Sequence, residues 1–120
     1  MATVPIRITE QLPVGNTTVN ANKIETTLTP PRATVKMAVE DIHMRLDPTA
    51  DGTGNVTFTI DTGVIKKQWV RPFITGLGAT MDYSSEIRGA LGGTVILTIA
   101  RTGLTKDGEI NWLESQYEGG

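Results

Sequence analysis

The feature that most constrains this chain is its wealth of side chains branched at the β-carbon. Of 120 residues, 19 are Thr, 11 Ile and 9 Val. Such side chains lose rotamer freedom in a helix and pack well on a pleated sheet. Good helix formers are few, and 13 Gly and 6 Pro divide the chain into short segments. The sequence therefore predicts an all-β fold, a single antiparallel sandwich or small barrel with at most one or two short helices.

The composition also limits the chemistry that the chain can perform. It has no Cys and one His, which excludes disulfides, thiolate zinc sites, Cys nucleophiles and sites with two histidines. A net charge of −2 disfavours nucleic acid as a partner. No run approaches the roughly 18 apolar residues of a membrane span, and the start shows no signal-peptide pattern. We therefore expect no cofactor, no membrane contact and no secretion.

The first segment, Thr3–Thr9, alternates in the manner of a strand. Val4, Ile6 and Ile8 share one face. Pro5 cannot donate a hydrogen bond to a neighbouring strand, so the segment is expected at a sheet edge or as an arm laid on a neighbour. These four residues are candidate contact residues.

A change in composition divides the chain near residue 33. Residues 1–33 contain four of the six prolines and a polar stretch, which is typical of an extended N-terminal arm. Residues 34–120 then form the β-domain. Within the arm, Lys23–Thr29 alternates and is expected to be a strand.

The segment Thr34–Leu46 fits a strand whose phase slips at Glu40-Asp41. A β-bulge produces such a slip. Val56–Ile60 alternates clearly, so we expect it to pair with the preceding strand. The nine residues Asp47–Asn55 would then be a long hairpin loop.

The second half of the chain shows weaker signals. Val64–Thr75 predicts one strand, or two strands broken at Pro72. Glu86–Leu91 could form a single helical turn. Thr94–Ala100 is the most apolar run and is expected to be a central strand buried on both faces. From Asp107 onward a short helix and a terminal strand are nearly equal alternatives.

One triplet, Asp61-Thr62-Gly63, resembles the catalytic triplet of aspartic proteases, including the small dimeric retroviral type. That resemblance implies a dimeric hydrolase in which Asp61 supplies half of a carboxylate pair. The chain departs from the family at Val64, where Ala or Ser is usual, and too few residues follow for the family spacing. An Asp-Thr-Gly turn is also an ordinary way to end a strand. This activity is an alternative and not our main expectation.

A second alternative is a cation- or glycan-binding adhesin-like module. Asp47, Asp51 and Asn55 could supply oxygen ligands from one loop. The Glu that an EF-hand requires at the twelfth position is replaced by Thr62. Metal binding is therefore not our expectation.

The single histidine, His43, lies between two apolar residues. A Ser–His–Asp arrangement would require Ser84, Ser85 or Ser115 nearby, and the spacing does not indicate this. We expect an exposed strand histidine.

The segment Lys66–Arg71 combines bases with an aromatic residue. Stacking on nucleic acid is conceivable, but three charges in an acidic protein give a weak signal. Trp69 and Arg71 are residue types common in protein interfaces, and they complete the candidate contact residues.

With its Thr-rich alternating strands, its Pro-bearing N-terminal region and its lack of a catalytic constellation, the chain resembles small structural proteins of tailed bacteriophages. These are capsid cement (decoration) proteins and neck or tail components. The resemblance implies a non-enzymatic virion protein, otherwise cytoplasmic, that forms homo-oligomers, often trimers. It also implies contact with a larger assembly such as the major capsid protein, made here through the arm and strand edges.

Overall fold

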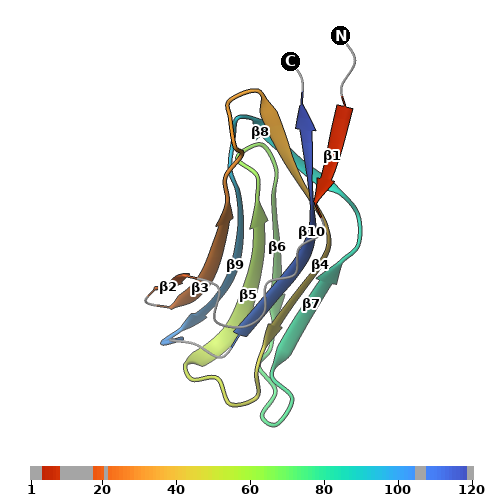
Figure 1. Cartoon of the computed structure of the whole chain (residues 1–120). Coiled ribbons are helices and arrows are strands. Elements are labelled where there is room, and N and C mark those ends of the chain that lie inside the picture. The colour runs from red at the N-terminus through yellow and green to blue at the C-terminus, as the bar shows by residue number, and fades with distance from the viewer. Residues whose placement is uncertain (1–3, 9–17, 21, 105–107, 119–120) are drawn as a thin grey trace.

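In the described residues of the computed structural model, ten strands lie in two antiparallel sheets that stack as a sandwich (Figure 1). The structure describes residues 4–8, 18–20, 22–104 and 108–118. The first sheet contains β1 (Val4–Ile8), β10 (Gly108–Glu118), β4 (Val35–Leu46), β7 (Ala79–Tyr83) and β8 (Ile87–Leu91). The second sheet contains β2 (Thr18–Asn20), β3 (Lys23–Leu28), β9 (Val95–Thr102), β5 (Thr53–Asp61) and β6 (Lys66–Arg71). The predicted all-β class is confirmed.

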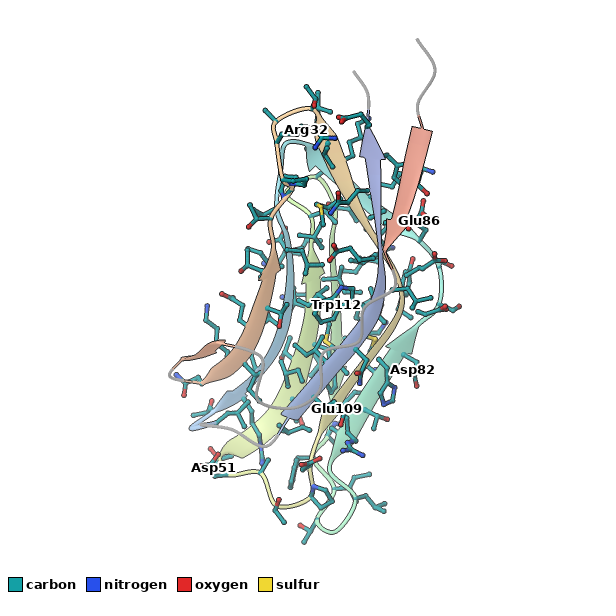
Figure 2. All side chains as sticks on the ribbon, in the orientation of Figure 1. Arg32, Asp51, Asp82, Glu86, Glu109 and Trp112 are labelled. Carbon is teal, nitrogen blue, oxygen red and sulfur yellow. The ribbon has the colours of Figure 1, made fainter. Side chains whose placement is uncertain are left out.

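Each sheet buries one face because apolar residues alternate along its strands. Val56, Phe58 and Ile60 of β5 are fully buried between the sheets. From the opposite sheet, Trp112 of β10 is 1% exposed and is labelled near the middle of the molecule in Figure 2. Its indole nitrogen donates a 3.4 Å hydrogen bond to Glu114, so the polar end of this large side chain is satisfied within the interior.

The strand β4 contains the predicted bulge. Asp41 has a φ of 48°, and the register with β10 shifts between Asn111 and Leu113. The bulge also separates two partners along one edge of β4, because β7 pairs with Ile42–Leu46 and β8 pairs with Lys36–Val39. β7 and β8 therefore lie one after the other along the same edge of β4, with a break between them opposite the bulge.

The expected hairpin between Thr34–Leu46 and Val56–Ile60 is wrong. β4 lies in the first sheet and β5 in the second, so the loop between them crosses from one sheet to the other. β5 pairs instead with β9 and with β6, which follows it in the chain. Periodicity identified both strands, but it carries no information about which strand lies beside which.

The helical turn considered for Glu86–Leu91 is wrong, because Ile87–Leu91 forms strand β8, and of the two alternatives left open after Asp107 the strand is the one that forms. Ile87 and Gly89 of β8 face inward. A Cβ at Gly89 would meet Val95 Cγ2 at 3.2 Å, so the absence of a side chain there lets β8 pack closely against the opposite sheet. Beyond Asp107, which lies outside the described residues, β10 pairs with both β4 and β1. This pairing satisfies the backbone on two sides at Glu114–Glu118.

The apolar run at Thr94–Ala100 forms a central strand, as expected, because β9 lies between β3 and β5. It is buried on one face only. Val95, Leu97 and Ile99 are buried, whereas the residues between them are partly exposed.

The N-terminal strands join both sheets. β1 pairs antiparallel with the end of β10, and β3 pairs with β9 and contributes Ile24 and Leu28 to the core. In the part of the chain that the structure describes, no helix has the length and apolar character needed to cross a membrane.

A hydrogen-bonded cluster joins the loop before β4 to the end of β10. The Arg32 guanidinium donates to Glu118, with an Nε–Oε1 distance of 2.7 Å, and the Thr34 hydroxyl donates to the other carboxylate oxygen at 2.8 Å. The bond from Arg32, and then that from Thr34, holds the pKa of the Glu118 carboxyl below its usual value.

This lowered pKa predicts a stability contribution that acid removes. Because the folded-state pKa lies below the unfolded value, the contribution is present in full above about pH 4.5 and is lost as the pH falls through the folded-state pKa. We expect the difference in unfolding midpoint between the wild type and Glu118→Gln to shrink on acidification, measured in urea at a series of pH values. A difference that stays constant from neutral to acidic pH would contradict this.

Two glycines in the turn between β6 and β7 provide a matched test of backbone geometry. Gly76 and Gly78 have φ values of 87° and 77°. A Cβ at Gly76 meets open space, whereas one at Gly78 would collide with the carbonyl oxygen of Leu46. We expect Gly76→Ala to cost about 1 kcal/mol, the price of a left-handed conformation, and Gly78→Ala about 3 kcal/mol or more, by chemical denaturation. Equal losses would show that the Leu46 contact does not matter.

Candidate functional site

Exposed apolar side chains are concentrated around one edge strand. Among the described residues, six large hydrophobic side chains are exposed, and all but Leu91 fall between positions 64 and 77. These five are Val64, Ile65, Val70, Ile74 and Leu77. We call β6 and these flanking residues the β6 surface. The five side chains lie on β6 and in the turns at its two ends, and exposed apolar groups gathered along one strand, unlike single residues scattered over a surface, are typical of an interaction site.

The strand β6 presents different residues on its two faces. Lys67 and Trp69 point toward the other sheet and are partly buried, whereas Lys66, Gln68 and Val70 are exposed on the outer face. Trp69 packs against the core and lies 5.5 Å from the Tyr83 ring, at an angle of 52°. This contact joins the edges of the two sheets, which no backbone ladder connects in the described residues.

Positive charge accompanies these apolar side chains. Lys66, Lys67 and Arg71 form no ion pair with any described carboxylate. Lys67 lies over the Tyr83 ring at 5.7 Å, and Arg71 donates only to the neighbouring Val70 carbonyl at 3.3 Å. The cations therefore remain available to an acidic partner.

The turn after β6 borders a hollow of about 390 Å³. Ile74 and Gly78 close the turn, with 3.1 Å between the Ile74 nitrogen and the Gly78 oxygen. This tight closure leaves Ile74 50% and Leu77 71% exposed at the wall of the hollow, next to Arg71. An apolar side chain of a partner could be seated there.

The predicted contact residues fall in two places. Trp69 and Arg71 both lie on β6, within the β6 surface. Val4, Pro5, Ile6 and Ile8 lie on β1, at the opposite sheet, where β1 pairs with β10 of the same chain. Their contact with a neighbouring subunit stays a prediction.

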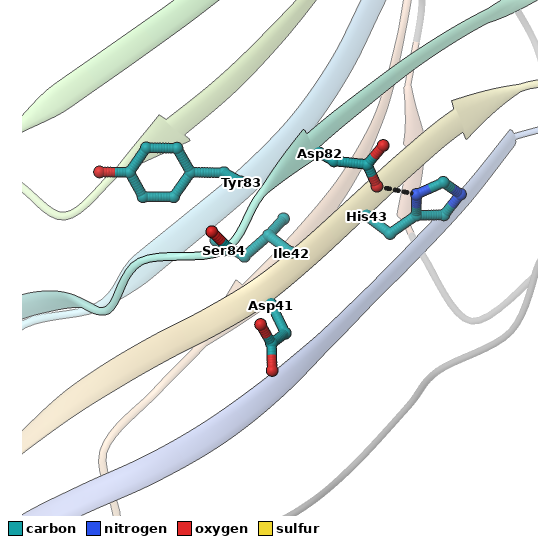
Figure 3. Close-up of a pocket in the computed structure, with 6 residues that line it drawn as sticks. All are labelled: Asp41, Ile42, His43, Asp82, Tyr83 and Ser84. Atoms are coloured by element: carbon teal, nitrogen blue, oxygen red, sulfur yellow. Dashed lines mark hydrogen bonds and ion pairs between the residues drawn. The ribbon is translucent and has the colours of Figure 1, made fainter.

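A second hollow, of about 180 Å³, surrounds the single histidine (Figure 3). The register of β4 and β7 places His43 opposite Asp82, and the His43 Nδ1 and an Asp82 carboxylate oxygen share a hydrogen bond. Ser84 lines the same hollow, but in Figure 3 the second ring nitrogen of His43 points away from Ser84. Asp82 was not identified from the sequence because it lies 39 residues from His43.

The Asp61 triplet forms the turn between β5 and β6. The Asp61 carboxylate accepts a 2.9 Å hydrogen bond from the Gly63 nitrogen, and the Thr62 hydroxyl accepts a bond of the same length from the Ile65 nitrogen. The triplet therefore has a local structural role in this chain. A dimeric hydrolase stays a prediction that one chain does not test.

The loop between β4 and β5 is held by backbone contacts. The Arg101 guanidinium donates to the carbonyls of Gly54 and Asp51, at 3.0 and 3.2 Å, and lies 3.8 Å from the Phe73 ring. Asp47 pairs with Arg45 at 3.2 Å. No group of three or more His, Cys, Asp or Glu side chains able to hold a metal occurs among the described residues.

A polar network lies on the first sheet, where β8 and β10 both flank β4. The Tyr117 hydroxyl donates to Glu86 at 2.7 Å, and Arg88 donates to the other oxygen of Glu86 and lies 4.0 Å above the Tyr117 ring. The bond to Glu86, and then burial, raises the pKa of the Tyr117 hydroxyl. The bond to Glu86 likewise raises the pKa of Arg88, so the Tyr117 hydroxyl stays neutral and the Arg88 guanidinium stays charged near neutral pH.

Comparison with known proteins does not identify a family. No protein-family model and no curated protein matches the sequence. Three solved structures resemble the fold remotely. The first is dimeric latent PorU from Porphyromonas gingivalis, at 11% identity over 98% of this chain and 12% of that chain, with a TM-score of 0.48. The second is from the disulfide-linked pili of Bacillus endospore appendages, at 15% identity over 98% of this chain and 89% of that chain, with a TM-score of 0.40. The third is the CBM36-1 domain of a xylanase from the hindgut metagenome of Trinervitermes trinervoides, at 10% identity over 99% of this chain and 98% of that chain, with a TM-score of 0.30. These scores carry no argument about function.

The two tryptophans predict a fluorescence signal for the β6 surface. Trp69 is partly exposed, whereas Trp112 is 1% exposed. We expect Trp112→Phe, which retains Trp69, to emit at longer wavelength and to be quenched more strongly by acrylamide than Trp69→Phe. Equal quenching of the two variants would contradict the placement of Trp69 at the surface.

Proposed function

We propose that the protein is a non-catalytic structural subunit that attaches to a larger assembly through the β6 surface. One observation carries this proposal: five of the six exposed large apolar side chains in the described residues gather around a single edge strand. Apolar surface gains free energy when it leaves water, at about 25 cal/mol per Å². A partner that covers these side chains would be stabilised by that burial.

The setting that we favour is a bacteriophage virion. It derives from the resemblance of the sequence to capsid decoration proteins, which implies a subunit that stabilises a capsid lattice. An all-β domain without helices in its described residues is compatible with that role. Strand edges and exposed loops are its means of contact. The expected oligomer, a trimer in many such proteins, belongs to the same proposal.

We include no catalytic step in this proposal. Asp61 forms a turn, Asp47 pairs with Arg45, and Glu86 accepts hydrogen bonds from Arg88 and Tyr117. Each of these carboxylates supports local structure, which accounts for its presence without chemistry.

The attachment can be tested by removing apolar contact from the β6 surface. We expect the chain, tagged in its native source, to sediment with particles that also contain a capsid protein. Val70→Ser combined with Leu77→Ser should shift most of it to slowly sedimenting fractions. These side chains are 56% and 71% exposed, so folding should change by no more than about 0.5 kcal/mol.

Leu91→Ser is the matched control, because Leu91 is 44% exposed but lies on β8, away from the β6 surface. It should sediment like the wild type. Particle binding that survives the double substitution would refute the β6 surface as the contact, and particles without a capsid protein would refute the virion setting. Deletion of residues 1–12 tests the arm in the same assay.

A further inference from the structure

We propose that the partner binds by adding an extended, acidic strand to the outer edge of β6. This inference rests on the proposed function, because it names the chemistry that the β6 surface recognises. It follows from three features of β6: the direction of its backbone groups, the charge of its side chains and the apolar residues at its two ends.

The first feature is an open backbone edge. The Thr62 nitrogen donates to the Ile65 oxygen at 2.9 Å, which makes this pair the first hydrogen-bonded pair of the β5–β6 hairpin. In an antiparallel ladder, hydrogen-bonded and non-bonded pairs alternate. Lys67, Trp69 and Arg71 therefore direct their backbone groups toward β5.

The intervening residues direct their backbone groups the other way. The N–H and C=O groups of Lys66, Gln68 and Val70 point to the outer edge, where no described strand pairs with them. β7 lies nearby but belongs to the other sheet. Five of these six groups are open to an added strand, and the sixth, the Val70 carbonyl, already accepts a bond from the Arg71 guanidinium.

The second feature is charge, which selects the partner. Lys66, Lys67 and Arg71 have no carboxylate partner among the described residues, whereas Arg45 and Arg88 elsewhere each pair with an acid. Acidic side chains on an added strand would therefore meet uncompensated cations, and such complementarity favours both encounter and register.

The same charges argue against a second copy of this chain. If two β6 strands paired antiparallel about Gln68, so that the outward residues 66, 68 and 70 faced one another, the six cations of the two copies would lie on one pair of strands with no acid on either β6. In a parallel pair, each cation would lie next to its own counterpart. Like charges directly opposite are destabilising, and lysine on an edge strand is a known obstacle to self-association.

The third feature is the apolar side chains that flank the strand. Val64 and Ile65 precede β6, and Ile74 and Leu77 follow it beside the 390 Å³ hollow. Exposed apolar side chains do not keep an edge strand from pairing with other chains. Their presence beside β6 therefore favours a binding role over a purely protective one. The six residues of β6 span about 20 Å, so a partner segment of similar length, acidic at its ends and apolar within, fits the edge.

The experiment uses a defined probe, the blocked peptide Glu-Ile-Thr-Val-Thr-Glu, with purified full-length protein. Hydrogen exchange is followed by NMR at each amide of β6. We expect the peptide to slow exchange at Lys66, Gln68 and Val70, while Lys67, Trp69 and Arg71, already bonded to β5, change little. The same peptide with Lys in place of both Glu should bind at least about tenfold more weakly, since each lost charge contact of this kind is worth roughly 1 kcal/mol.

A proline substitution tests the backbone bonds. Gln68→Pro removes an N–H that points to the outer edge and leaves the β5 ladder intact, a position where an edge strand tolerates proline. We expect it to weaken peptide binding by about tenfold or more, as the loss of one central hydrogen bond and the bulk of the ring imply. Gln68→Ala is the matched control, because it also loses the 3.4 Å contact with Thr59 but keeps the N–H.

Several results would overturn the inference. No protection of the three outward amides at millimolar peptide would do so, as would undiminished binding by a folded Gln68→Pro variant. Amide protection that rises with protein concentration alone would indicate a second copy, and binding to phosphatidylserine vesicles that Lys66→Glu abolishes and Gln68→Pro spares would indicate a lipid surface. If particle attachment depends on Val70 and Leu77 but not on the Gln68 N–H, the proposed function stands and the strand-addition mechanism fails.

Discussion

The structure depends on the alternation of apolar and polar side chains, which lets two sheets hide one face each against the other. Phe58 and Trp112 meet this requirement from opposite sheets. Because a slip of one residue would turn every inward side chain of a strand to the outer face, the register of each strand is fixed. The outer faces and the edges are then the surfaces left for contact with other molecules.

The edges differ in how the chain treats them. At the first sheet, β1 covers one side of β10 with a proline-containing strand. At the second sheet, no described strand pairs with the outer edge of β6, and cations and apolar side chains surround that edge. This contrast within one domain is why we assign the contact surface to β6.

The sequence allowed the strands to be predicted much better than their neighbours. Alternation found β3 and β5, and the phase slip at Asp41 found the bulge in β4. Alternation does not encode pairing, so the crossover between β4 and β5 was missed. After Asp107 the sequence left helix and strand open, and the strand forms as β10, which buries Ile110 and Trp112.

The candidate site was only half visible in the sequence. Trp69 and Arg71 stood out by residue type, but the exposure of Ile74 and Leu77 depends on a turn closed by Gly78, which no pattern of apolar residues reveals.

The break between β7 and β8 along the edge of β4 could not be predicted from the sequence either. Since Ser84 and Ser85 are exposed opposite the bulge, where neither strand register has to continue, extra residues inserted between them should leave both sheets intact. The connection between β7 and β8 is therefore a suitable position for inserting a reporter or a second domain.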